Sequence, residues 1–273
     1  MKLINQKVEY IPQQEGIEGI YKQIELAGRT SYKSEDKITE NSAKSFVDRM
    51  IKSNHGAVLE HGTVYLSIPI SEWDSIESFN LTYGNNNYTF VDYSDVDWFN
   101  WEGMVYITTN YRVLVENGWL DDLKFLSSPT EFHEKRYTFK LTTSRGISHE
   151  LVRHRVFSFT QESQRYCNYT KNKFGKEITF IKPSWWNNVD DSDLFLKCIK
   201  DIENSYRVML LEGLQPQQAR EILPNCTKTE IVMTGFKYNW DYFFDLRLYG
   251  TTGTPHPEML ILSKLINEKF KTL

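Results

Sequence analysis

The most informative part of the sequence is residues 137–166, YTFKLTTSRGISHELVRHRVFSFTQESQRY. Apolar and polar residues alternate over 137–141, which predicts a β-strand. Ser148 is a suitable helix N-cap, so a short helix should carry Glu150 and the first residue of the Arg-His-Arg string at 153–155. The basic string is therefore expected at a strand–helix–loop junction, where rigid elements support functional side chains.

Residues 153–166 gather cations and hydroxyl groups in a chain that is slightly acidic overall. Arginine offers a planar fork of donors that holds phosphate or carboxylate through two hydrogen bonds, so several forks close together indicate an anion site. The alternative is a basic helix end that offsets the helix dipole. That role needs one cation and contributes about 0.3–1 kcal/mol. Because a helix-end role would not explain the hydroxyl groups, we favour the anion site.

Composition limits the kind of protein that surrounds this site. The 273 residues are 40% hydrophobic and 14% aromatic, enough for a large core, and we expect a single domain over residues 1–273. Residues 80–100 are rich in Asn, Asp, Tyr and Gly and predict an irregular insertion. The formal charge of -4 disfavours a nucleic-acid partner, so an anion would have to be captured locally.

Three cysteines, Cys167, Cys198 and Cys226, form no Cys-x-x-Cys pair, which argues against a disulfide framework or a thiolate metal site. We expect a soluble, cytoplasmic protein, because no stretch is apolar enough for a signal peptide or a membrane span. Nearby cations could activate Cys167 as a thiolate nucleophile. The favoured interpretation is that Cys167 is a small, half-buried residue.

Known catalytic motifs are missing from the sequence. His55 and His61 lack the spacing of a helical zinc site, and we expect no metal. The chain has no Gly-x-Ser-x-Gly elbow, no phosphate-binding Gly-x-x-x-x-Gly-Lys loop and no Gly-x-Gly-x-x-Gly fingerprint. Their absence weakens the hydrolase, nucleoside triphosphatase and ordinary nicotinamide-domain interpretations.

Periodicity predicts an α+β fold, a mixed sheet with flanking helices, without the strand–helix alternation of a dinucleotide-binding domain. A strand is expected over 64–68, and Thr39 is expected to cap the helix that carries the apolar stripe of residues 43–51. The further predicted helices cover residues 17–24, 107–116, 199–210, 216–223, 240–248 and 258–270.

The basic stretch resembles the signature of the flavin-dependent thymidylate synthases, R-H-R-x-x-S-x-N-x-x-S-x-R-Y, and matches seven of its eight fixed positions. Three more segments resemble family segments in the same order along the chain: His55 to His61, Ala219 to Pro224, and the Leu-Arg pair that ends at Arg247. This agreement extends from about residue 17 to residue 258.

The resemblance implies reductive methylation of dUMP to dTMP. Methylenetetrahydrofolate would supply the carbon, and FAD reduced by NADPH would supply the hydride. It also implies a homotetramer of α+β protomers with shared active sites. No cysteine would be needed, because this family does not attack the pyrimidine with a thiolate.

The resemblance also implies roles for individual residues. Arg247 would be catalytic, stabilising negative charge on the uracil ring. The residues that would bind dUMP are Glu150, Arg153, Ser163, Arg165 and Arg220. The residues that would bind FAD are Arg153, His154, Arg155, Gln161 and His55.

The sequence departs from the family pattern beside the expected flavin site. Thr160 replaces the signature Asn, Gln161 stands where Glu is common, and Ala57 replaces a hydroxyl residue. Phe236, Lys237, Tyr238 and Tyr242 occupy a stretch where many members have polar flavin contacts. Two alternatives stay open: a folate-dependent pyrimidine nucleotide hydroxymethylase, and a single-stranded nucleic-acid-binding protein that uses its aromatic residues for stacking.

Overall fold

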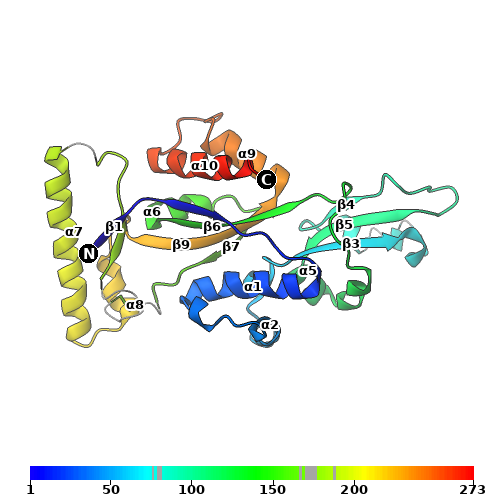
Figure 1. The fold of residues 1–273 in the computed structure, drawn as a ribbon, viewed down its shortest axis with the longest axis horizontal. Helices are drawn as coiled ribbons and strands as arrows, with labels where there is room; N and C mark the ends of the chain where they lie inside the picture. The colour runs from blue at the N-terminus through cyan, green and yellow to red at the C-terminus, as the bar shows by residue number, and fades with distance from the viewer. Residues whose placement is uncertain (76, 79–81, 166–167, 170–176, 187–188) are drawn as a thin grey trace.

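The computed structural model describes residues 1–75, 77–78, 82–165, 168–169, 177–186 and 189–273. The chain is a mixed α+β protein with a four-stranded sheet at its centre, a three-stranded sheet at one end and a two-stranded sheet with a long helix at the other (Figure 1). The expected α+β class is confirmed.

The central sheet has the strand order β2-β6-β9-β7, and its neighbouring strands are antiparallel. Its strands are β2 (Lys7–Tyr10), β6 (Arg136–Ser144), β7 (Ser158–Gln161) and β9 (Lys228–Phe236). The alternation over 137–141 predicted β6 correctly. Phe139 pairs with Met233 of β9, and both side chains are fully buried.

Different helices cover the two faces of the central sheet (Figure 1). On one face, α9 (Lys237–Arg247) and α10 (Pro257–Phe270) bury an apolar cluster that includes Phe139 and Trp240. The other face packs on α1 (Gly16–Tyr32) and is more polar, with Thr138 bonded to Thr234 across the strands at 2.8 Å. The apolar face anchors α9, which ends at the expected catalytic arginine.

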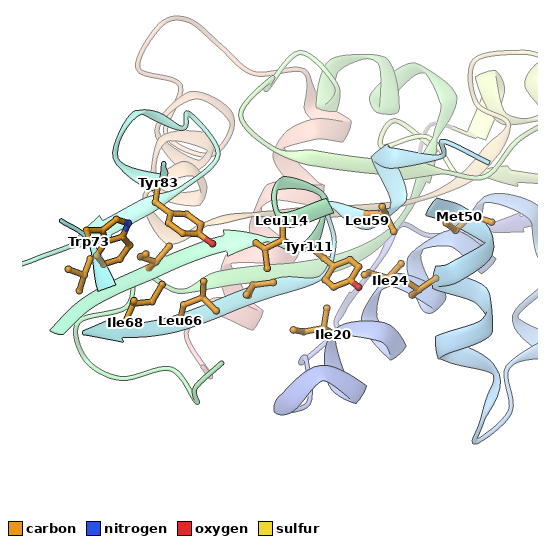
Figure 2. Close-up of a cluster of buried hydrophobic side chains, with 14 of the residues drawn as sticks. Ile20, Ile24, Met50, Leu59, Leu66, Ile68, Trp73, Tyr83, Tyr111 and Leu114 are labelled. Carbon is orange, nitrogen blue, oxygen red and sulfur yellow. The ribbon is translucent and has the colours of Figure 1, made fainter. Parts of the chain in front are cut away.

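The second sheet consists of β3 (Thr63–Pro69), β5 (Met104–Asn110) and β4 (Phe90–Asp92), with β5 in the middle. It shares a core with α1 and α2 (Ser42–Lys52), and Figure 2 shows Leu66 and Ile68 of β3 in line with Ile20 and Ile24 of α1. The strand expected over 64–68 is confirmed. Of the stretch expected to be irregular, the described residues 82–100 are largely so, but they also supply the edge strand β4.

The prediction of a helix over 107–116 is wrong for its first four residues. Residues up to Asn110 belong to β5, and the helix α5 runs over Tyr111–Asn117, with the Asn110 side chain accepting a hydrogen bond from the Val113 amide. The apolar residues before this cap satisfy a helical spacing, but pairing with β3 and β4 buries them in a sheet instead.

Two expected caps are also wrong. The N-cap of α2 is Asn41, and Thr39 contributes its backbone amide, which donates to Ser42 Oγ at 2.9 Å. The helix α6 (Arg145–Leu151) begins one turn earlier than expected, capped by Ser144 Oγ, so Ser148 lies inside it and is buried. Glu150 is on α6 as predicted, whereas Arg153 lies beyond its end.

The other predicted helices are present. They are α1, α7 (Val189–Leu211), α9, α10, and α8 (Pro216–Ala219) continued by a 3-10 turn over Arg220–Ile222. At the end of the molecule where α7 lies, β1 (Lys2–Ile4) pairs in parallel with β8 (Thr179–Ile181) (Figure 1). Within the described ranges, no helix combines the length and apolar character that a membrane crossing requires.

Candidate active site

The Arg-His-Arg string at 153–155 connects α6 to β7, and both elements are anchored in the central sheet. The helix α6 continues directly from β6, and β7 pairs with β9 from Ser158↔Thr234 to Gln161↔Ile231. The string is thus held at both ends by buried structure. His154 is buried, whereas Arg153 and Arg155 are exposed.

Arg247, the last residue of α9, reaches back to this junction. Its Nε donates to His154 Nε2 at 3.0 Å, and its Nη1 donates to Glu150 Oε2 at 3.0 Å. The Arg247 and Glu150 side chains keep 21% and 26% of their surface exposed, so the pair is accessible to a ligand. The structure brings these three predicted site residues into direct contact.

The protonation state of His154 allows its ring to accept the hydrogen bond from Arg247. Its ring lies 5.0 Å from the Phe243 ring, and burial, followed by the neighbouring Arg247 charge, lowers the pKa of His154 to about 4. The imidazole is therefore neutral at pH 7, with a lone pair on Nε2 for the arginine and the proton on Nδ1.

Arg247 lines one of two adjoining cavities. One, of about 440 Å³, is lined by Arg247 and by the whole 153–155 string; the other, of about 270 Å³, is lined by Arg136 and Ser158. Arg155, Val156, Tyr238 and Asn239 line both. The Phe236 and Tyr238 rings are stacked with centroids 5.3 Å apart and 9° between their planes. Cations, amides and a stacked ring pair suit an anionic ligand with a flat ring.

Sequence reasoning missed Arg136. It is the first residue of β6, and its Nη2 donates to the Oγ of Ser158, a signature residue, at 3.3 Å. Its position at the start of an alternating strand carries no signal of a site, because its partners Glu60, Thr63 and Ser158 are distant in sequence.

Two signature positions that depart from the family point into the protein. Thr160 Oγ1 is 3.0 Å from Nε2 of the fully buried His61, whose Nδ1 is 2.8 Å from Thr234 Oγ1. Gln161 donates to Ser148 Oγ at 2.8 Å and to Thr229 Oγ1 at 3.1 Å. Neither residue is among those lining the two cavities. The flavin role of Gln161 stays a prediction.

A third cavity, of about 240 Å³, contains Arg220 together with Arg145 and His149. Burial, and to a smaller extent the Arg220 charge, lower the pKa of Arg145. Arg220 Nε is 3.4 Å from the exposed Glu221 carboxylate. Two arginines that face one cavity suit an anion, and this cavity shares no lining residue with that of Arg247.

The remaining predicted residues do not line the Arg247 cavity. His55 is exposed at the start of the short helix α3 (Gly56–Leu59). Ser163 is half-buried and its backbone amide donates to Ser31 O at 2.9 Å, which ties the signature to α1. Arg165 is exposed, and Tyr166 lies outside the described residues.

The two cysteines of the described residues do not line the cavities of Arg247, Arg136 or Arg220. Cys198 is exposed, and burial raises the pKa of the Cys226 thiol to about 11. Cys167 lies outside the described residues. In the portions of the chain that the structure describes, no three His, Cys, Asp or Glu side chains gather in a group that could hold a metal ion.

Comparison with known proteins gives one family. The family model described as thymidylate synthase complementing protein matches residues 98–273. The chain is 30% identical to the flavin-dependent thymidylate synthase of Geobacter sulfurreducens, over 47% of this chain and 54% of the relative. It is 36% identical to the Pyrococcus abyssi enzyme of the same name, over 41% of this chain and 46% of the relative. These matches span about half the length of the relatives.

Among solved structures, the chain is similar to the UMP/dUMP methylase PolB from Streptomyces cacaoi, with 15% identity over 100% of this chain and 93% of that chain. The TM-score is 0.46. The family match covers more than half of the chain and includes the complete 153–166 signature, Arg220 and Arg247. The chain therefore belongs to the thymidylate synthase complementing protein family.

Proposed function

We propose that the protein is a flavin-dependent thymidylate synthase that converts dUMP to dTMP with methylenetetrahydrofolate as carbon donor and NADPH as reductant. Relatives at 30% and 36% identity carry that name. The observation that carries the proposal is the contact of Arg247 with both His154 and Glu150 at the rim of a cavity that Arg153 and Arg155 also line.

Arg247 would act on the uracil ring. Two acceptors fix its guanidinium plane, and its second terminal nitrogen has no hydrogen bond to the described residues. That nitrogen can stabilise the charge that develops as the uracil imide ionises and the pyrimidine carbon becomes nucleophilic. Preorganised donors of this kind typically contribute about 10²–10³ in rate. The described cysteines need take no part.

The nucleotide phosphate would bind to the arginine forks of Arg153, Arg165 and Arg220, with Ser163 as an uncharged donor. Arg220 and Arg153 line different cavities of one chain. A homotetramer, in which one copy completes the site of another, would bring such separated residues onto one ligand. The separation supports this assembly.

The residues present fit a flavin. Arg155 lines one cavity with the stacked Phe236 and Tyr238 rings, and the neutral His154 lines the adjoining cavity with Tyr238. The three hydrogen bonds of the Arg136 guanidinium leave further N–H donors available. When bound, FAD supplies the hydride, derived from NADPH, that completes the methyl group. These side chains would bind its anionic groups and its rings and keep water out of the cavity.

The test is a visible spectrum of the purified protein, anaerobic addition of NADPH, and then mass analysis of the nucleotide after addition of dUMP and methylenetetrahydrofolate. A flavin spectrum that bleaches with NADPH, followed by formation of dTMP, is expected. A product heavier than dTMP by one oxygen atom, formed without NADPH consumption, would instead identify a hydroxymethylase. A protein that neither binds FAD nor alters dUMP would contradict both activities.

A further inference from the structure

Arg136 is a cation surrounded by neutral acceptors. Its Nη2 donates to Glu60 O at 3.1 Å and Ser158 Oγ at 3.3 Å, and its Nη1 donates to Thr63 Oγ1 at 3.3 Å. A guanidinium has five N–H donors, so these bonds leave part of the group available. The cation also lies 5.5 Å from the centre of the Phe236 ring.

No carboxylate of the described residues lies within ion-pair distance of Arg136. The Glu60 carboxylate, whose charge raises the pKa of Arg136, forms its ion pair with Arg112. Burial lowers the pKa of Arg136 to about 10, so the group still carries its charge at neutral pH. A partly buried cation whose hydrogen bonds go only to neutral groups is costly, and a bound anion would reduce that cost.

The cavity above Arg136 has the composition of a ligand site. A second cation, Arg155, lies on its wall, together with the buried amides of Asn110 and Asn239. Tyr238, which is 49% exposed, stacks on Phe236 and presents an open ring edge and face. Two cations and two amides suit a phosphate group, and the ring pair suits a flat heterocycle.

We propose that Arg136 binds the phosphate of the aromatic cofactor that this cavity receives, its remaining N–H donors and those of Arg155 facing the phosphate oxygens while a ring system lies against Tyr238. This inference rests on the proposed function, under which the cofactor is FAD. It assigns cofactor binding to Arg136, which the family resemblance does not include. Under this inference, Arg136 and ring stacking would take the place of the polar flavin contacts that many family members have at the positions of Phe236 and Tyr238.

The experiment titrates FAD into wild-type protein, Arg136→Met and Arg136→Lys, and follows the quenching of flavin fluorescence. Losing hydrogen bonds to a charged group weakens binding by roughly tenfold to a hundredfold, which is the expected effect of Arg136→Met. Arg136→Lys should retain part of the affinity. Arg49→Met is the matched control, because Arg49 is exposed on α2 and lies over the Phe46 ring; its affinity should equal the wild-type value.

Arg136 is partly buried, so thermal melting must show that its variants fold. Arg155→Gln and Tyr238→Leu provide a second route, since both positions are exposed; each should weaken FAD. Riboflavin, which lacks the phosphates, should bind equally to wild type and Arg136→Met. The inference is overturned if folded Arg136→Met and Arg155→Gln bind FAD as wild type does, or if Arg136→Met weakens riboflavin as much as FAD.

ADP separates this inference from the proposed function, because it carries phosphates and a ring but no flavin. Calorimetry would measure its binding to wild type and Arg136→Met. If wild type binds ADP through Arg136 but no flavin, the thymidylate synthase proposal fails and the cavity assignment stands. If wild type binds neither ADP nor FAD, the cavity assignment fails too.

Discussion

Arg247 Nε and His154 Nε2 lie 3.0 Å apart although 93 residues separate them in sequence. The contact joins the end of α9 to the junction between α6 and β7. Only a neutral imidazole can accept this bond, because a protonated ring has no lone pair and would repel the guanidinium. The burial of His154 therefore controls the position of Arg247.

The first prediction concerns Arg247. Arg247→Ala should lower the rate of dTMP formation by at least about 10²-fold, since it removes a donor aimed at developing charge. Stability should change little, because its partly exposed ion pair with Glu150 contributes under about 1 kcal/mol. Single-turnover kinetics and FAD titration would check this result. Unchanged turnover would exclude Arg247 from the mechanism.

The second prediction concerns acid stability. The pKa of His154 is about 4 in the folded protein, below an ordinary value of about 6.5 in the unfolded chain. The unfolded state therefore binds more protons, and stability falls as pH decreases from about 6.5 toward 4. Between pH 7 and pH 5 this group alone should remove about 2 kcal/mol from the free energy of unfolding.

Urea unfolding of wild type and His154→Gln at the two pH values would test the effect. Glutamine keeps an acceptor for Arg247 but does not titrate, so the variant should lose about 2 kcal/mol less than wild type. His61, whose pKa burial lowers to about 3, acts in the same direction in both proteins and cancels in the difference. Equal losses would show that His154 is not the responsible group.

The sequence predicted those elements whose pattern is local. Alternation over 137–141 identified β6, and apolar stripes identified α1, α7, α9 and α10. The boundary at Asn110 failed, because pairing with β3 and β4 outweighed a helical spacing that was equally compatible with the residues.

The site could be predicted only through the order of its motifs. Resemblance named Arg247, His154 and Glu150, but neither composition nor periodicity could show that they touch, since the contact depends on how α9 packs on the sheet. The sequence could not predict a role for Arg136 for the same reason. Its partners belong to three segments that only the folded chain brings together.

The third prediction concerns Thr160, which replaces the signature Asn. Its hydroxyl bonds to buried His61 inside the sheet. Thr160→Asn, which restores the signature, should destabilise the protein by about 1–3 kcal/mol through overpacking. Thr160→Val keeps the volume but removes the partner of His61 Nε2 and should cost about 1–3 kcal/mol. Chemical denaturation would measure both; a stabilised Thr160→Asn would mean that the site has unused space.

The fourth prediction separates nucleotide binding from flavin binding. Arg220→Ala should weaken dUMP by roughly tenfold to a hundredfold and leave FAD affinity nearly unchanged, since Arg220 lines a different cavity from Arg136 and Arg155. Glu221→Gln is the matched control, because it removes the carboxylate beside Arg220 but keeps the cation. Its dUMP affinity should equal or exceed the wild-type value. Equal weakening of both ligands by Arg220→Ala would indicate a damaged fold.

The fifth prediction is that no cysteine takes part in the chemical step. The raised pKa of Cys226 keeps its thiol protonated at neutral pH, and exposed Cys198 is on α7, away from Arg247. A variant with serine at 167, 198 and 226 should therefore form dTMP at a rate close to the wild-type rate. Iodoacetamide treatment of wild type in the presence and absence of dUMP gives an independent readout. A folded but inactive triple variant, with inactivation by iodoacetamide that dUMP prevents, would require a thiolate nucleophile in place of the Arg247 mechanism.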